Sequence, residues 1–498
     1  MKKLLAFLLS ATVCLSLCAC SNDSGDEVTD SQTSETTAAG QVERTIYLMN
    51  YRPDADAVLK EIAQTYQSET GIPVKVVTAE SGTYEDTLTT ELGKENPPTI
   101  FQINGNRGYT NWADYCEDIS DTALYEHLSD KNLAITDGDG VYGIPYVIEG
   151  YGIIYNNDIM KNYFESEKKS TKYTSIDEIK SFSALKAVVE DMTLLKDELG
   201  IRGVFAPTSL KSGEDWRWHS HLANIPMYYE YKNNNVDLTS GNTNNVQFQY
   251  SDNFRNIFDL YLNNSTIDRA EVGNYNVSDS INDFATGQCA MMQNGNWAWN
   301  QIIAVDKNVV EAEDIGFIPI YMGIEGEENQ GLCIGSESYF AINSNASDAD
   351  QKLAEDFLYW MFSSEKGKDY VINKLGYIAP FDTFTESDIP NNPLSKQVVT
   401  WINREDVQNI PWTGFTMFPD QNFRDNFGSS LLGYANGSGN WEDVTGAFTT
   451  GWGGQAGTTG DNMIGNTNEN TAGNTDGNMP NNAGGNMNNN TPNNQTKQ

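Results

Sequence analysis

The chain has 498 residues, a formal net charge of −38 at pH 7 and 20% charged residues. Such an acidic protein has no basic stripe to replace the counterions of phosphates, which excludes nucleic acid as a partner. No run of Lys and Arg marks a pocket for an anionic ligand either, so the charge disfavours that class unless the fold builds a local basic pocket.

The chain begins with the features of a bacterial export signal. Lys2 and Lys3 precede the apolar stretch 4–17, which is too short for a stable membrane span. Leu17-Cys18-Ala19-Cys20 then resembles the lipobox of bacterial lipoproteins. The resemblance implies that residues 1–19 are a lipoprotein signal peptide and that acyl chains (diacylglycerol and palmitate) on Cys20 anchor the protein to the extracellular face of the cell membrane. An ordinary secretory signal with cleavage nearby is the alternative.

Two segments lack the large apolar residues that a core requires. Residues 20–44 are rich in Ser, Thr, Asp and Glu and are predicted to form a flexible tether. Residues 453–498 consist mainly of Asn, Gly and Thr and are predicted to form a disordered tail. The chain between them is too long for one simple core, so we expect two lobes.

The first part of that chain alternates between strand and helix patterns. Strands are expected at residues 45–49, 74–77 and 99–103, separated by a helix that ends at Gly71 and by a second helix at 85–92. This alternation is typical of a parallel α/β sheet, which binds ligands beyond the carboxyl ends of its strands. The polar residues expected there are Asn50, Tyr51, Gln102, Asn104 and Arg107.

A later segment, residues 347–362, has the pattern of an amphipathic helix. Ser347 and Asp350 form a possible capping pair, and apolar residues repeat on one face. We expect that face, which includes Phe357 and Trp360, to lie in a core rather than to contact a ligand.

Cysteine and histidine indicate neither a disulfide framework nor a metal site. Cys116, Cys289 and Cys333 remain after the signal and the lipidated residue, and their wide spacing leaves one bridge open. His219 and His221 have no third ligand close in sequence, so we expect a polar loop there. We expect no metal and no cofactor.

Several segments, in order, resemble the extracellular solute-binding proteins of carbohydrate ABC importers, the group that includes the maltose-binding protein. Residues 284–299 match the family's pattern of Phe, a Gly-polar step, Ala-Met and Gly-x-Trp. Residues 144–146 and 153–158 resemble its crossover into a second lobe, and 336–343 and 362–367 resemble its return. The resemblance covers about residues 45–437.

The resemblance implies a periplasmic-binding-protein-like α/β fold with two lobes, crossing hinge segments and a ligand cleft between the lobes. We expect lobe 1 at residues 45–145 plus 333–376 and lobe 2 at 146–332 plus 377–452. The family implies that a sugar closes the cleft and that a membrane permease recognises the closed form. The chain is then a monomer and not an enzyme.

The resemblance also selects site residues, because a neutral sugar requires aromatic platforms and a polar rim. Trp297 is at the position that stacks sugar in the maltose-binding protein, and Trp299 follows it. Glu149 matches a carboxylate that contacts sugar hydroxyls there. Glu214 and Trp216 resemble a Glu-x-Tyr pair of the family. Trp218 lies in the same charged and aromatic run, and Trp412, Phe418 and Asp420 lie in a second aromatic stretch.

Each of these residues also has a purely structural interpretation. A core would also accommodate Trp297 and Trp299, residues 214–218 suit a surface loop with half-buried rings, and Glu149 suits a structural hydrogen-bond acceptor. Three other functions stay open. Glu149 and Glu214 are the paired carboxylates that a glycoside hydrolase would need. A fixed sugar-binding adhesin and a peptide- or polyamine-binding protein are the other two.

Overall fold

The structure is a computed structural model that describes residues 44–80, 82–235, 246–385, 387–412, 418–419 and 421–453. The predicted signal peptide and Cys20 lie outside the described residues, as do the tether before Arg44 and the tail beyond Gly453. In the described part of the chain, no helix is both long enough and apolar enough to cross a membrane.

Six strands form the first sheet, in the order β2-β1-β3-β10-β5-β4. They are β1 (Ile46–Asn50), β2 (Val74–Thr78), β3 (Ile100–Asn104), β4 (Ile135–Asp137), β5 (Gly140–Pro145) and β10 (Ser338–Ile342). β1 runs parallel to β2 and β3, and β10 runs antiparallel to β3 and β5. The three predicted strands therefore lie within one residue of β1, β2 and β3.

Local sequence signals place the helices of this sheet. α1 (Asp56–Thr70) ends at Gly71, whose φ of 78° suits a left-handed C-cap. α12 (Asp348–Ser363) begins after Ser347, whose hydroxyl accepts the backbone N–H of Asp350 at 3.3 Å. The helix end and the cap predicted from sequence are both confirmed.

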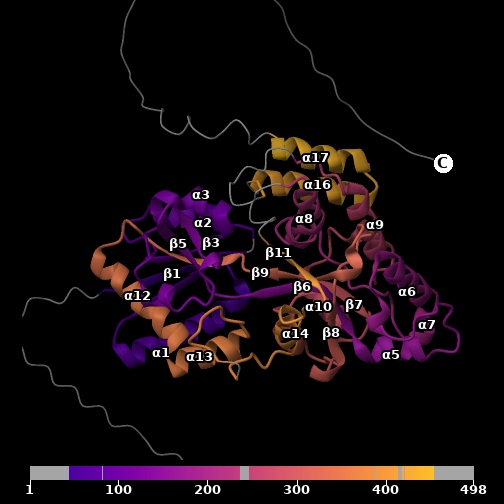
Figure 1. Cartoon of the computed structure of the whole chain (residues 1–498), viewed down its shortest axis with the longest axis horizontal. Helices are drawn as coiled ribbons and strands as arrows, with labels where there is room; N and C mark the ends of the chain where they lie inside the picture. The colour runs from indigo at the N-terminus through magenta and orange to yellow at the C-terminus, as the bar shows by residue number, and fades with distance from the viewer. Residues whose placement is uncertain are drawn as a thin grey trace, which may run out of the picture. The chain divides into compact units, whose positions relative to one another are not determined.

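Alternate residues of β1 point to opposite faces, and each face has its own core. Ile46 and Leu48 pack with α1 and α12, where the Tyr66 and Phe357 rings lie 5.0 Å apart. Met49 packs on the other face, with α2 (Tyr84–Leu92) and α3 (Gly105–Trp112). Figure 1 shows these helices on either side of the strands.

The second sheet has five strands, in the order β11-β9-β6-β7, with β8 paired to β6. They are β6 (Glu149–Asn156), β7 (Met291–Gly295), β8 (Ile315–Ile318), β9 (Gln330–Gly335) and β11 (Gln408–Pro411). Two clusters of buried residues cover its faces: Ile153 and Met291 belong to one, and Ile154 and Met292 to the other.

Most of the remaining helices pack around the second sheet (Figure 1). These are α5 (Asn157–Glu165), α6 (Phe182–Leu194), α7 (Lys196–Leu199), the π-helix η5 (Arg217–Leu222), α8 (Asn224–Asn233), α9 (Ser251–Asn263), α10 (Val277–Ala285), α11 (Ala298–Ile303), α14 (Pro393–Ile402), α16 (Gln421–Asn436) and α17 (Trp441–Gly453). The first sheet also has α4 (Ala123–Glu126), α13 (Glu365–Asp369) and the π-helix η10 (Tyr370–Leu375).

The chain changes sheets three times. It crosses between β5 and β6, returns between β9 and β10, and crosses again after Phe381, which still packs in the core of the first sheet. Leu394 already belongs to the second sheet's core. The boundary expected at residue 333 falls inside β9, because Cys333 pairs with Tyr151 of β6. The assignment of the parts to two lobes stays a prediction.

Cys116, Cys289 and Cys333 are free and buried. The one bridge that the sequence left open therefore does not form between them.

Candidate functional site

Five rings from the second sheet and its connections meet in one group, here called the aromatic cluster: Tyr151, Trp216, His221, Trp297 and Trp412. The Trp297 ring lies 6.0 Å from both Tyr151 and Trp216, and 6.4 Å from Trp412. Tyr151 lies in β6, Trp216 and His221 lie at the start of η5 and within it, and Trp297 and Trp412 follow β7 and β11. Segments far apart in sequence thus build one aromatic surface.

Trp216 and Trp297 are the half-buried members of the cluster, whereas the other three rings are buried. Gly295 explains how the Trp297 ring folds back over the end of β7. A Cβ at that position would lie 2.2 Å from the ring. The predicted stacking residue is therefore not sealed in a core, and its glycine neighbour sets its orientation.

The polar candidates from the first sheet bond mainly to one another. The backbone N–H of Tyr51 donates to Gln102 Oε1 at 2.7 Å, and Asn50 Nδ2 donates to the carbonyl of Arg52 at 2.7 Å. The Tyr51 and Ser338 hydroxyls lie 2.5 Å apart. Asn50 and Gln102 are fully buried, so these amides hold the ends of β1 and β3 in place.

Glu337 joins the two groups. One carboxylate oxygen lies 3.5 Å from His221 Nε2 in the aromatic cluster, and the other accepts from Asn104 Nδ2 at 3.2 Å. Burial alone would raise the pKa of Glu337, but His221, Arg52 and Asn104 together hold that pKa below its ordinary value. The carboxylate thus stays ionised where the chain returns to the first sheet.

Glu149, predicted as a sugar contact, forms a buried ion pair. Its Oε1 lies 2.8 Å from Arg52 Nη1, and Arg52 also contacts Asp54. Burial is the largest influence on Glu149 and, with the nearby charge of Glu337, raises its pKa to about 7 in spite of Arg52. The pair links the end of β1 to the start of β6 across the two sheets.

Three other predicted residues lie outside the aromatic cluster. Trp218 is 0% exposed, packs against Phe258 and donates its indole N–H to the Thr208 carbonyl. Glu214 accepts the backbone N–H of Val277 at the start of α10. Trp299 packs against the core that contains α10 and α14. A role for these three residues as ligand contacts stays a prediction.

The second aromatic stretch divides in a similar way. Trp412 joins the aromatic cluster, whereas Phe418 is buried against Trp452 of α17. Asp420 lies outside the described residues. The weaker candidate Arg107 lies on α3, next to the end of β3.

The expectation of a polar loop at His219 and His221 was wrong. Both side chains are buried, in the π-helix η5. Burial lowers the pKa of His219 well below 6.5, which keeps that ring neutral. Among the described residues, no group of three or more His, Cys, Asp or Glu side chains is arranged to hold a metal ion.

Sequence reasoning also missed Glu337, Arg52 and Tyr151 as members of the site. A signal existed for the first two: Glu337 is a lone acid between two serines in the expected return segment, and Arg52 lies in the polar turn after the first strand. Tyr151 had none, because it lies in a strand whose residues are nearly all buried.

Two glycines bring the two halves of the site into contact. Gly82 precedes α2 of the first sheet, and Gly213 precedes the Trp216 segment of the second. A Cβ at Gly82 would lie 3.0 Å from the Gly213 Cα, and both residues have positive φ. Only residues without side chains allow so close an approach.

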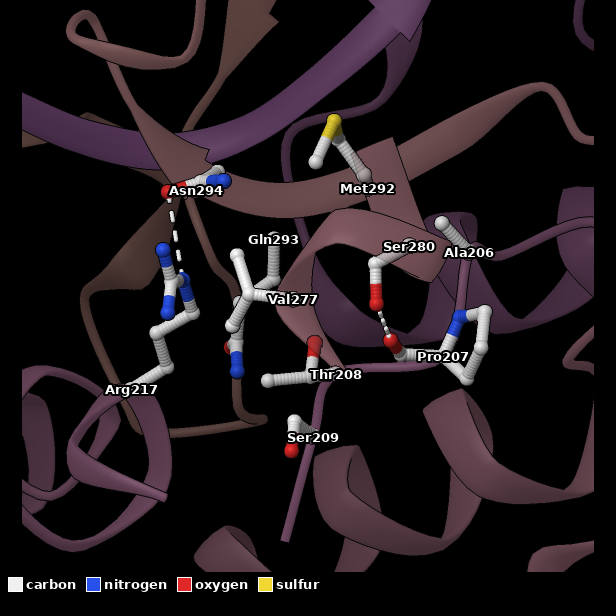
Figure 2. Close-up of a pocket in the computed structure, with 10 residues that line it drawn as sticks. All are labelled: Ala206, Pro207, Thr208, Ser209, Arg217, Val277, Ser280, Met292, Gln293 and Asn294. Carbon is white, nitrogen blue, oxygen red and sulfur yellow. Dashed lines mark hydrogen bonds between the residues drawn. The ribbon is translucent and has the colours of Figure 1, made fainter. Parts of the chain in front are cut away.

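A small hollow, partly open to solvent, lies beside Arg217. Figure 2 shows Arg217, Gln293 and Asn294 on one side of it, and Thr208 and Ser209 on the other. Arg217 lies over the Trp216 ring at 4.0 Å, so the hollow adjoins the aromatic cluster.

A sequence model described as bacterial extracellular solute-binding protein matches residues 61–397. No curated protein matches the sequence. Among solved structures, a chitin oligosaccharide binding protein is similar with a TM-score of 0.61 and 17% identity, over 82% of this chain and 98% of its own.

Two further similar structures were solved with a sugar. RafE in complex with raffinose has a TM-score of 0.61 and 18% identity, over 82% of this chain and 99% of its own. A sugar transporter of Bacillus licheniformis in complex with stachyose has a TM-score of 0.58 and 16% identity, over 82% and 98%. At these identities the likeness shows the fold, which is that of the periplasmic binding proteins.

Proposed function

The chain belongs to the bacterial extracellular solute-binding proteins, and from this premise we propose that it captures a sugar or oligosaccharide and delivers it to an ABC permease. The aromatic cluster is the observation that carries the proposal. Two half-buried indoles, Trp216 and Trp297, lie 6.0 Å apart at 45°, an arrangement that offers ring faces to the CH patches of a sugar. The similar structures in complex with raffinose and stachyose, and the similar chitin oligosaccharide binding protein, support the same ligand class.

The polar rim of the site comes from the first sheet and the return segment. Tyr51, Asn104 and Glu337 offer hydroxyl, amide and carboxylate groups of the kind that sugar hydroxyls bind. A sugar that contacts these groups and the aromatic cluster together favours the form in which both halves meet. The proposed lobes are those that contain the two sheets, and binding closes them onto the ligand.

The anchor and the binding role fit together. Lipid on Cys20 would hold the protein at the membrane, where the permease is, and residues 20–44 would let the folded part move. The protein then needs no catalytic group. Glu149 and Glu214, the candidate pair for hydrolysis, are engaged by Arg52 and by the Val277 backbone.

A ligand screen tests the proposal. Raffinose, stachyose, maltotriose, chitotriose and uronic acid oligomers are added to the protein without its signal peptide and tail, and thermal unfolding is followed. A bound sugar raises the free energy of unfolding by RT ln(1 + [L]/Kd) and therefore raises the melting temperature. Chromatography of the same mixtures measures turnover. A binding protein shows saturable binding without product, whereas loss of substrate identifies a hydrolase, and a flat screen overturns the proposal.

A further inference from the structure

Gln293 is a buried side chain whose polar groups have no partner. It lies in the middle of β7 and is 3% exposed, yet neither Oε1 nor Nε2 has a hydrogen-bond partner among the described residues. A buried amide without a hydrogen-bond partner destabilises the folded protein. This destabilisation is removed when a ligand group supplies the missing hydrogen bonds.

Arg217 lies beside this amide, and its guanidinium also lacks a full set of polar partners within the described part of the chain. It is buried, and its guanidinium has no carboxylate within 4.0 Å among the residues described. Its polar contact is a hydrogen bond from Nε to Asn294 Oδ1 at 3.3 Å, and its flat face covers Trp216. Burial lowers the pKa of Arg217 to about 10, so the group stays charged at neutral pH.

Gln293 and Arg217 both line the same hollow. Figure 2 shows the Gln293 amide between Arg217 and Thr208, facing the space that the ten lining residues enclose. A buried cation and an amide thus converge on one space beside the half-buried Trp216. Such a combination suits a small group with two acceptor oxygens, because a planar guanidinium binds a carboxylate through two parallel hydrogen bonds.

We propose that this hollow binds the carboxylate of an acidic sugar, with Arg217 as its counter-ion and Gln293 as the donor to its second oxygen. The inference rests on the proposed function and narrows it: the ring that carries the acid lies next to Trp216, and the uncharged faces of the saccharide stack on the aromatic cluster. The overall charge of −38 disfavours anionic ligands, but Arg217 supplies the local basic pocket that such a ligand requires.

Matched ligand pairs test the carboxylate itself. Trimers of galacturonic acid and of glucuronic acid are each compared with their methyl esters, which keep the ring stereochemistry and remove the charge. Calorimetry at pH 7 measures each Kd. Because hydrogen bonds to charged groups are the stronger class, we expect the better acid to bind ~10-fold or more tightly than its ester.

Two variants assign this preference to the hollow. Arg217→Gln removes the cation, and Gln293→Glu keeps the side-chain shape but places a competing carboxylate beside Arg217. Both should reduce the acid-to-ester ratio to about one. Arg404→Gln is the matched control, because it removes the same charge from an exposed pair with Asp406 and should leave the ratio unchanged. Circular dichroism establishes that each variant is folded, and the ester Kd provides a second readout.

The outcomes separate this inference from the function on which it rests. If raffinose, maltotriose or chitotriose binds and neither acid binds more tightly than its ester, the carboxylate site is refuted while the sugar-binding function stands. Preference for an acid that survives Arg217→Gln refutes the site equally. If no saccharide in either panel binds, the proposed function fails and this inference fails with it.

Discussion

The two sides of the candidate site satisfy their polar groups in different ways. On the first-sheet side, Tyr51, Gln102 and Ser338 bond to one another, and the Tyr84 hydroxyl donates to the Gln102 carbonyl. On the second-sheet side, the rings predominate, and the buried amide of Gln293 has no partner among the described residues. The first network holds the strand ends in position and leaves Asn104 Oδ1 as a buried acceptor without a partner among the described residues, whereas on the second side both polar groups of the Gln293 amide are left for a ligand.

The two sides should contribute differently to ligand affinity. A polar group that is already hydrogen-bonded gains little from a ligand, since it must exchange one partner for another. An aromatic face that is open to the ligand, or a buried amide without a hydrogen-bond partner, gains the full interaction energy because it gives up no existing contact. The second-sheet side should therefore dominate ligand affinity, and the first-sheet side should dominate geometry.

The largest expected effect concerns a ring of the second-sheet side that serves the core. Trp218→Ala removes a fully buried indole that packs on Phe258, and should lower the free energy of unfolding by roughly 3–5 kcal/mol. Urea denaturation measures the loss. If the variant unfolds like the wild type but fails to bind sugar, Trp218 belongs to the binding site. Its assignment to the core would then be wrong.

The next effect is a pH dependence of stability that also arises on the second-sheet side. Burial raises the pKa of Asp215 from 3.8 to about 6, and neighbouring Asp425 adds to the rise. Between these values the folded protein binds more protons than the unfolded chain, so this group's contribution to the unfolding free energy falls as pH rises.

Asp215→Asn removes this contribution. The wild type should lose on the order of 2 kcal/mol relative to the variant between pH 4 and pH 6. Urea titrations of both proteins at pH 4, 5 and 6 measure the difference. Equal slopes would show that Asp215 is ionised in the folded protein throughout this range.

A pair of variants compares the two sides directly. Trp297→Ala should weaken binding of the best sugar in the screen ~10-fold, which is about 1.4 kcal/mol, because it removes a stacking face. Tyr51→Phe should weaken it about twofold or less, since its hydroxyl already lies 2.5 Å from Ser338. Calorimetry measures both constants. A larger loss for Tyr51→Phe would reverse the assignment of affinity to the second-sheet side.

The smallest expected effect lies where the two sides touch. Gly82→Ala adds a methyl group 3.0 Å from Gly213, whereas Gly71→Ala adds one at the same positive φ with no atom within 4 Å. Both variants should lose about 1 kcal/mol of stability to backbone strain. We expect only Gly82→Ala also to lose affinity, severalfold, because it hinders contact between the halves. Equal affinities would mean that this contact is not required for binding.

Sequence reasoning succeeded where the signal is local. The first strands alternate with helices, Gly71 ends α1, and Ser347 caps α12, all because a few neighbouring residues decide each feature. The family resemblance rested on the order of such segments. The fold was therefore predictable without knowledge of any long-range contact.

The site was less predictable, because its contacts join distant segments. Trp216 and Trp218 look equivalent in sequence, but the π-helix η5 turns Trp218 into the core while Trp216 stays with the aromatic cluster. Glu149 pairs with Arg52 only because the ends of β1 and β6 meet. Gln293 looks like an ordinary strand residue in the sequence, and only the structure shows that its buried amide has no hydrogen-bond partner among the described residues.

The three thiols of the folded part have a practical consequence. Burial raises the pKa of Cys116 to about 12 and those of Cys289 and Cys333 well above 9, so at neutral pH they are protonated and shielded from alkylating reagents. Cysteines introduced at the exposed positions Lys60 and Lys186, one beside each sheet, would then be the reactive ones. Dyes attached there would report the separation of the two sheets as ligand is added, without removal of any native cysteine from the folded part.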